Sequence, residues 1–234
     1  MQKVMFSDLG KMNYKSAWDL QEKLLQGNVI LKNQTSLSAD VMPTVNYMLL
    51  VEHPPVYTIG KSGHMENVLI SQEEMHEREI AFFKTNRGGD ITFHGPGQLV
   101  CYPVLDLENF NTDIGKYLRN LEEVVIRCLA NYGLTGKRSA GETGVWLQAE
   151  NNEQDRKICA IGVRCSRWIT MHGLALNVNT DLSYFDNIVP CGIRNKQVTS
   201  LQKELNKEIP MHEVKKIFTD NFQDVFEVKL LDLD

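Results

Sequence analysis

The sequence predicts an α+β fold in which helices pack on a mixed or antiparallel sheet. Short strand-like segments cluster between three helical segments, too close together for a regular alternation of strand and helix. The chain contains no internal repeat, no low-complexity tract and no linker rich in Pro, Gly or Ser. Its 234 residues are enough for one sizeable core, so we expect residues 1–234 to form a single catalytic domain.

Three segments carry apolar residues at helical spacing, at about residues 14–26, 113–132 and 210–225. Asn111 or Thr112 is expected to cap the second helix, and Pro210 opens the third. Predicted strands lie at residues 47–52, 56–59, 91–93, 99–104, 144–147, 158–163 and 174–178. Because these strands occur in clusters rather than one per helix, they favour a mixed or antiparallel sheet.

The composition is ordinary for a soluble globular protein and argues against two classes of function. A net charge of −5 disfavours a nucleic-acid binder that works by neutralising phosphates. No apolar run is long enough to span a bilayer or to act as a signal peptide, so we expect a cytoplasmic protein without membrane binding. No heptad repeat favours a dimer, and we expect a monomer.

The cysteines and histidines predict neither a disulfide framework nor a metal site. The five cysteines form no CxxC pair and are odd in number, so without a secretion signal we expect reduced thiols. The six histidines are scattered, without the spacing of common metal-ligand motifs. We therefore expect neither a metal nor a cofactor.

One cysteine and one lysine stand out as candidate reactive groups. Cys191 lies between a proline and a glycine, in an irregular turn where a side chain can face a cleft. Lys157 opens an apolar run within a stretch, residues 156–180, that contains no Asp or Glu. A nearby cation favours the thiolate of a cysteine, and burial or a neighbouring charge makes a lysine a usable acid or base. This pair is our first candidate for chemistry.

The same acid-free stretch concentrates positive charge, since Arg156, Arg164 and Arg167 accompany Lys157. A basic face on an acidic protein suits the docking of an acidic protein or a phosphorylated carrier group. An ordinary solvated surface explains the same residues equally well.

The most unusual segment, residues 87–98, contains four glycines and is flanked by strand patterns. Its main-chain N–H groups can hold a carbonyl oxygen, a carboxylate or a phosphate. The alternative is a tight hairpin around Gly95 and Gly97 that binds no ligand. His94 in this segment is either an acid–base group or structural, whereas His53 better fits a structural role. His172 precedes another glycine, which suggests a second segment whose main chain lines a ligand site.

Six segments, taken together in their order and spacing, resemble the octanoyltransferase family of lipoate biosynthesis. They are EHPPVYTIG (52–60), RGGDITFHGPGQ (87–98), RKICAIG (156–162), TMHGLALNV (170–178), PCG (190–192) and VTSL (198–201). The resemblance implies the fold of lipoate-protein and biotin-protein ligase catalytic domains, a mixed sheet flanked by helices. It also implies an enzyme, an acyltransferase.

The resemblance further implies which residues act. Cys191 matches the acyl-accepting cysteine, and Lys157 matches its partner lysine. The residues implied to contact the acyl group and its carbonyl are Arg87, Gly88, Gly89, Asp90, Ile91, Thr92, Phe93, His94, Ala160, Ile161, Gly162, Gly173, Leu174 and Ala175.

The implied reaction transfers an octanoyl group from octanoyl-acyl carrier protein, through a thioester on Cys191, to a specific lysine of lipoyl domains. The implied acceptors are lipoyl domains of 2-oxoacid dehydrogenase E2 subunits and the glycine cleavage H protein. This first step of endogenous protein lipoylation needs neither ATP nor a metal. Two alternatives stay open, namely an ATP-dependent lipoate-protein ligase on the same fold and an acyl-carrier-binding module without catalysis.

Overall fold

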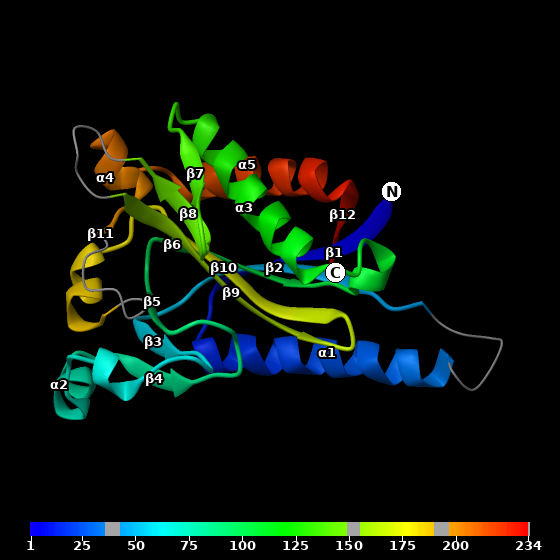
Figure 1. The fold of residues 1–234 in the computed structure, drawn as a ribbon, viewed down its shortest axis with the longest axis horizontal. Helices are drawn as coiled ribbons and strands as arrows, with labels where there is room; N and C mark the ends of the chain where they lie inside the picture. Colours follow the sequence, from blue (N-terminus) through cyan, green and yellow to red (C-terminus); the bar gives the residue numbers. More distant parts are fainter. Residues whose placement is uncertain (36–42, 149–154, 190–196, 234) are drawn as a thin grey trace.

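A nine-stranded mixed sheet forms the centre of the computed structural model, which describes residues 1–35, 43–148, 155–189 and 197–233 (Figure 1). Its strands are, in spatial order, β12 (Val228–Asp232), β1 (Gln2–Lys11), β2 (Asn46–Glu52), β6 (Gln98–Val104), β10 (Ile169–Asn177), β9 (Arg156–Ser166), β8 (Glu142–Leu147) and β7 (Gly136–Ser139), and β11 (Gln197–Val198) also pairs with β9. The β1–β2, β1–β12 and β9–β11 pairs are parallel, and the other pairs in this sheet are antiparallel. The predicted mixed sheet is confirmed.

Helices cover both faces of this sheet (Figure 1). Helix α1 (Tyr14–Thr35) packs on one face, and α3 (Ile114–Ala130) and α5 (Met211–Phe226) pack on the other. Strand β2 serves both cores, because Leu49 and Val51 pack with α1 whereas Met48 and Leu50 belong to the core beneath α3 and α5. Within the described ranges, no helix has the length and apolar character needed to cross a bilayer.

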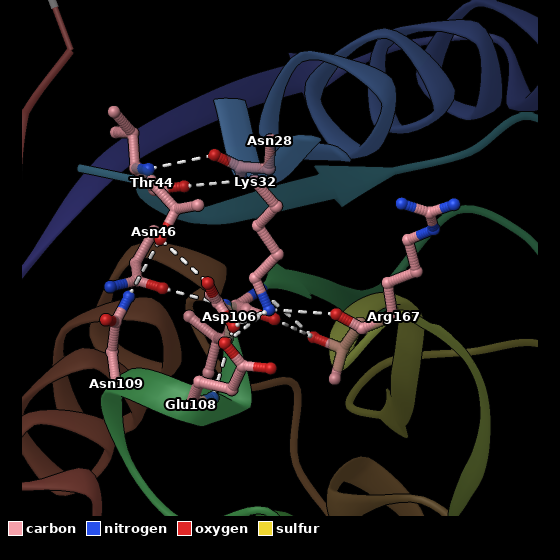
Figure 2. A network of polar contacts seen from close by, with 11 residues as sticks. Asn28, Lys32, Thr44, Asn46, Asp106, Glu108, Asn109 and Arg167 are labelled. Atoms are coloured by element: carbon pink, nitrogen blue, oxygen red, sulfur yellow. Dashed lines mark hydrogen bonds and ion pairs between the residues drawn. The ribbon is translucent and has the colours of Figure 1, made fainter. Parts of the chain in front are cut away.

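A polar network fixes the turn of the β9–β10 hairpin against α1, as Figure 2 shows. The ammonium nitrogen of Lys32 lies 2.7 Å from a carboxylate oxygen of Asp106 and 3.1 Å from one of Glu108. It also donates a hydrogen bond of 2.9 Å to the main-chain carbonyl of Arg167 at the hairpin turn. Because Lys32 and Asp106 are both largely buried, removing either one would leave the other as an unpaired buried charge.

A second, three-stranded sheet carries the glycine-rich segment. Its order is β4 (Ala81–Lys84), β3 (Val56–Ile59) and β5 (Ile91–His94), and α2 (Gln72–Glu77) precedes β4. Its core includes Tyr57, Phe93 and Phe185, and the ring of Phe93 stacks on that of Tyr184 at 4.4 Å between centroids. This small core anchors the start of β5, and the glycine-rich residues just before it reach the large sheet.

Every predicted helix and strand is present, with differences at the ends. Helix α1 extends to Thr35, and the second helix is capped by Asp113, which accepts from Lys116 N, rather than by Asn111 or Thr112. The elements that were not predicted are β1, β4, β7, β11, β12, α2 and α4 (Leu201–Leu205). Most of these are short or lie at sheet edges, where the sequence has little hydrophobic periodicity.

Candidate active site

A cavity of about 600 Å³ lies where the glycine-rich segment meets strands β9 and β10. Its lining includes residues 87–92, Lys157 with residues 159–163, and residues 172–175. Segments far apart in the sequence therefore meet around one cavity. Its volume is in the range of small-molecule sites in proteins.

Small side chains form the floor of the cavity. The β9–β10 register places Ala160 opposite Ala175 and Gly162 opposite Gly173. Directly opposed residues of antiparallel strands project on the same face, so these four residues form one patch. Ala175 belongs to the core on the α1 side of the sheet, so the floor lies on that side. The absence of large side chains on this patch leaves room for a ligand.

The glycine-rich segment covers this floor because its backbone is held from two directions. Gly88 N donates to the carbonyl of Val163 on β9 at 2.9 Å, and Lys61 N donates to the carbonyl of Arg87 at 2.9 Å. A Cβ built on Gly162 would lie 2.9 Å from Gly88 O and 3.3 Å from Cδ of Arg87. Gly162 is therefore required for the close approach of segment and strand.

The hairpin interpretation of this segment accounts for only part of the geometry. Gln98 N donates to Gly95 O at 3.2 Å, and Gly97 has a φ of 75°, so a tight glycine turn exists. The strands on either side of it, β5 and β6, nevertheless belong to different sheets. The turn passes the chain from one sheet to the other and places residues 87–92 over the floor.

The side chain of Arg87 ties the glycine-rich segment to the small sheet. Its guanidinium donates through Nη2 to the carbonyl and hydroxyl of Thr58, at 2.6 and 3.0 Å, and through Nη1 to Gly88 O at 3.0 Å. Arg87 is buried and lines the cavity, so it places a fixed positive charge beside the ligand space.

One end of the cavity is lined by neutral imidazoles and phenols. The network around His94 fixes its tautomer, because Gln98 donates its amide hydrogens to Phe93 O and Asn177 Oδ1 and so accepts through Oε1 from His94 Nδ1 at 2.8 Å. Burial, with the nearby His53, lowers the pKa of His94 to about 3, so the ring is neutral near pH 7. The ring of Tyr14 stacks on it at 5.9 Å, and burial raises the pKa of Tyr14 to about 12.

His172 closes the same end of the cavity. It has a φ of 59°, and its Nε2 lies 2.7 Å from Oδ1 of Asn86. Burial lowers its pKa to about 3, with Arg87 and Arg164 acting in the same direction. His53 does not line the cavity. Its ring nitrogens lie 2.7 Å from Met12 O and 2.8 Å from the Tyr102 hydroxyl, which fits the structural role expected for it.

Lys157 lines the opposite end of the cavity because a β-bulge turns its side chain. The β8–β9 register pairs Val145 with Cys159 but Trp146 with Lys157, so β9 contains one extra residue at this point. Ile158 and Cys159 consequently both belong to the core beneath α3. The extra residue reverses the side to which Lys157 points. Its side chain therefore lies on the same side of the sheet as the floor residues and lines the cavity.

Cys191 lies outside the described residues, but the chain on both sides of residues 190–196 is anchored at the cavity. Val189 N donates to Asn67 O at 2.8 Å, and the Asn67 side chain donates to the carboxylate of Asp90 at 2.7 Å. On the other side, Val198 lines the cavity and pairs with Lys157. The described residues on either side of this segment, Val189 and Val198, therefore both lie close to the cavity lining.

Among the described cysteines, Cys159 is the one that lines the cavity. It is 0% exposed, and burial raises its pKa far above that of a free thiol, although Lys157 acts in the opposite direction. Cys101 and Cys128 are buried in the main core. None of these three thiols is poised as a nucleophile. Within the described residues there is also no cluster of three or more side chains suited to a metal ion.

Most residues expected to contact the acyl group line the cavity. These are Arg87, Gly88, Gly89, Asp90, Ile91, Thr92, His94, Ala160, Ile161, Gly162, Gly173, Leu174 and Ala175. Phe93 does not, since its ring belongs to the small core, where it stacks on Tyr184. Sequence reasoning missed Tyr14, Tyr102 and Glu142, which come from elements without a recognisable motif.

Two arginines of the acid-free stretch pair with acidic residues from elsewhere in the chain. Two bonds, at 2.9 and 3.0 Å, join the Arg156 guanidinium to the carboxylate of Glu204. Arg164 pairs with Glu22 at 2.8 Å. Acidic partners from elsewhere in the chain thus neutralise these two positive charges.

Comparison with known proteins identifies the family. The model of the lipoyl protein ligase A/B catalytic domain matches residues 13–223. An octanoyltransferase of Christiangramia forsetii is 56% identical over 97% of this chain and 97% of its own length, and one of Flavobacterium johnsoniae is 56% identical over 98% and 99%.

Solved structures show the same fold at low identity. A bi-partite lipoate protein ligase of Thermoplasma acidophilum, studied with its E2 lipoyl domain, has a TM-score of 0.71 at 17% identity and covers 100% of this chain and 88% of its own. A biotin protein ligase of Aquifex aeolicus in complex with biotin and ATP has a TM-score of 0.52 at 13% identity, covering 95% and 70%. The predicted fold class is therefore confirmed. By its sequence and its fold, the chain belongs to the octanoyltransferases, acyltransferases of the lipoyl protein ligase A/B catalytic-domain family.

Proposed function

We propose that this enzyme takes an octanoyl group from octanoyl-acyl carrier protein onto Cys191 and passes it to a lysine of a lipoyl domain. The observation that carries the proposal is that Lys157 lies on the same face of the sheet as the small residues of the floor. A cation therefore borders a cavity with room for an acyl chain. The flanks of the Cys191 segment, anchored at the same cavity, support the pairing of Cys191 with Lys157.

The first step acylates Cys191. Lys157 as the ammonium ion stabilises the Cys191 thiolate, and the thiolate attacks the carbonyl carbon of the octanoyl thioester on the phosphopantetheine arm. A new carbon–sulfur bond forms, and collapse of the tetrahedral intermediate breaks the bond to the phosphopantetheine sulfur. That sulfur leaves with the Lys157 proton as a thiol. Octanoyl-Cys191 and a neutral Lys157 amine remain.

The second step uses the neutral amine as a base. The acceptor lysine enters as an ammonium ion and gives one proton to Lys157. Its nitrogen attacks the thioester, loses its second proton to solvent and forms the amide, while Cys191 leaves as a thiolate. The starting ion pair is restored. A thioester is exchanged for an amide, so the sequence runs downhill without ATP.

The glycine-rich segment supplies a candidate donor for the tetrahedral oxyanion. The carbonyl of Gly89 accepts from Ser62 N at 3.2 Å, which fixes the peptide between Gly89 and Asp90. The N–H of Asp90 belongs to this peptide and points away from Ser62, and it is the donor that we propose. One fixed donor to the oxyanion stabilises the transition state by about 3 kcal/mol in comparable sites.

Our choice of acyl donor and acceptor is supported by the related proteins. The curated relatives are octanoyltransferases, and the Thermoplasma ligase was studied with an E2 lipoyl domain. For this chain we propose octanoyl-acyl carrier protein as donor and, as acceptors, the lipoyl domains of 2-oxoacid dehydrogenase E2 subunits and glycine cleavage H protein. We further propose that it works in the cytoplasm as a single-domain monomer.

The rival is an ATP-dependent ligase on the same fold, since one structural neighbour is a lipoate-protein ligase A bound with ATP. The two are separated by offering an apo lipoyl domain either octanoyl-acyl carrier protein without ATP or free octanoate with ATP. We expect octanoylation only in the first reaction. Modification only in the second would overturn the transferase proposal, and binding of the carrier without modification in either would point to a non-catalytic module.

A further inference from the structure

We infer that Trp146 is a positioning residue for Lys157, and that it acts together with the bulge in β9. The inference rests on the proposed function, because it gives Lys157 its role beside Cys191. It concerns residues outside the cavity lining, since neither Trp146 nor Gly144 lines the cavity.

The first observation is the ring beneath the cation. The ammonium nitrogen of Lys157 lies 4.9 Å from the centroid of the Trp146 ring, within the range of a cation–π interaction. Trp146 is 2% exposed, so little water competes for this face of the ammonium group. A buried indole ring gives the strongest form of this interaction.

The second observation is the register, which places ring and cation on the same face. Trp146 lies directly opposite Lys157, whereas its neighbours Val145 and Leu147 belong to the core beneath α3. Without the extra residue in β9, Lys157 would project with Cys159 into that core. The bulge and Trp146 together turn the lysine towards the cavity.

The third observation is a glycine that leaves space for the lysine side chain. Gly144 has a φ of 131°, and a Cβ built on it would lie 2.7 Å from Cε of Lys157 and 2.6 Å from the carbonyl oxygen of Cys159. Glu122 of α3, 0% exposed, accepts from Gly144 N at 3.0 Å and so fixes this position. Gly144 and Trp146 thus both border the ammonium end of the lysine side chain.

The test measures the reactivity of Cys191 and so does not depend on turnover. At neutral pH, iodoacetamide alkylates Cys191 as the thiolate, and peptide mass spectrometry separates this residue from the other cysteines. We expect Trp146→Leu to slow alkylation by about 5- to 30-fold, and Trp146→Phe, which keeps an aromatic face, to slow it by less than about 3-fold.

A double-mutant cycle shows whether Trp146 acts through the lysine. In the Lys157→Ala background, we expect Trp146→Leu to have no further effect on the alkylation rate. Val145→Ala is the matched control, because it removes buried volume from the same strand on the opposite face. It should lower the unfolding midpoint and leave alkylation unchanged.

The outcomes separate the inference from the proposed function. If Lys157→Ala slows alkylation but Trp146→Leu does not, or if Trp146→Leu slows it equally in both backgrounds, Trp146 does not position the lysine. If Lys157→Ala itself leaves the rate unchanged, the Cys191–Lys157 pair of the proposed function fails, and the inference fails with it.

Discussion

The two ends of the cavity differ in their titratable groups, although the same pair of strands forms both. At one end, the side chains of His94, His172 and Tyr14 are buried, uncharged near pH 7 and fixed by hydrogen bonds or ring stacking. At the other, Lys157 lies on an aromatic ring next to a β-bulge. Along β9, Lys157 lies at one end, and Val163, which pairs with His172, lies at the other.

This difference suggests how an acyl group is oriented. We place the hydrocarbon tail at the end formed by His94, His172 and Tyr14, whose side chains stay uncharged near pH 7. The guanidinium of Arg87 near this end is held by hydrogen bonds to Thr58 and Gly88. The thioester carbonyl belongs at the Lys157 end, where the proposed mechanism moves protons. The floor of Ala160, Gly162, Gly173 and Ala175 joins the two.

The largest expected effect comes from replacing Lys157, the proposed base. Lys157→Arg keeps a positive charge but cannot give up its proton, so overall transfer should fall by about 1000-fold. Acylation of Cys191 should persist, because in this variant the phosphopantetheine sulfur can leave as a thiolate that solvent protonates. Octanoyl-enzyme should therefore accumulate in the presence of an apo lipoyl domain. Intact-protein mass and a lipoyl-domain assay measure the two steps. Normal turnover by this variant would remove Lys157 from the proton-transfer role.

The next largest effect should come from closing the channel between the ends. In Gly162→Ala the new methyl group would lie 2.9 Å from Gly88 O, so the glycine-rich segment must move off β9. Displacement of this order costs about 100-fold in kcat/KM for the octanoyl donor. Gly88→Ala meets only Val163 O, at 3.4 Å, and should lose much less. Equal losses in the two variants would argue against this close approach as the determinant.

The buried histidines at and near the His94 end should make the free energy of unfolding depend on pH. Burial lowers the folded pKa of His53 to about 4 and those of His94 and His172 to about 3, below the ordinary value of 6.5. Between pH 6.5 and about 4, the unfolded chain binds more protons, so stability falls as the pH drops through this window. Each histidine contributes about 1.4 kcal/mol per pH unit.

Urea unfolding between pH 7 and pH 5 measures this slope. His172→Gln should reduce it by about 1 kcal/mol per pH unit on average over this range, whatever its effect on stability at pH 7. A slope unchanged by the substitution would mean that His172 titrates in the folded protein as it does in the unfolded chain.

The smallest effect tests a position remote from both ends. Gly27 lies within α1, and a Cβ there would meet nothing within 4 Å. Gly27→Ala should stabilise the protein by about 0.5–1 kcal/mol and leave transfer unchanged. Thermal unfolding with a transfer assay measures both. A loss of transfer here would weaken the argument that Gly162→Ala acts locally.

The sequence predicted the elements of the site better than their arrangement. Periodicity located β9 and β10, and the glycine pattern located the segment that covers them, because burial and backbone freedom leave local traces. The bulge in β9 leaves none. Strict alternation would put Lys157 on the face opposite Ala160 and Gly162, and only the pairing with β8 and β11 sets the shift. The same holds for Arg156 and Arg164, whose acidic partners lie far away in the sequence.

The most direct test of the two-step account is the intact mass of the protein after incubation with octanoyl-acyl carrier protein in the absence of ATP. Wild type and Cys191→Ala are compared, and an apo lipoyl domain is then added. The account predicts one octanoyl adduct on wild type, none on the variant, and loss of the adduct when the lipoyl domain arrives. An equal adduct on Cys191→Ala, or no adduct on a wild type that still octanoylates the lipoyl domain, would contradict it.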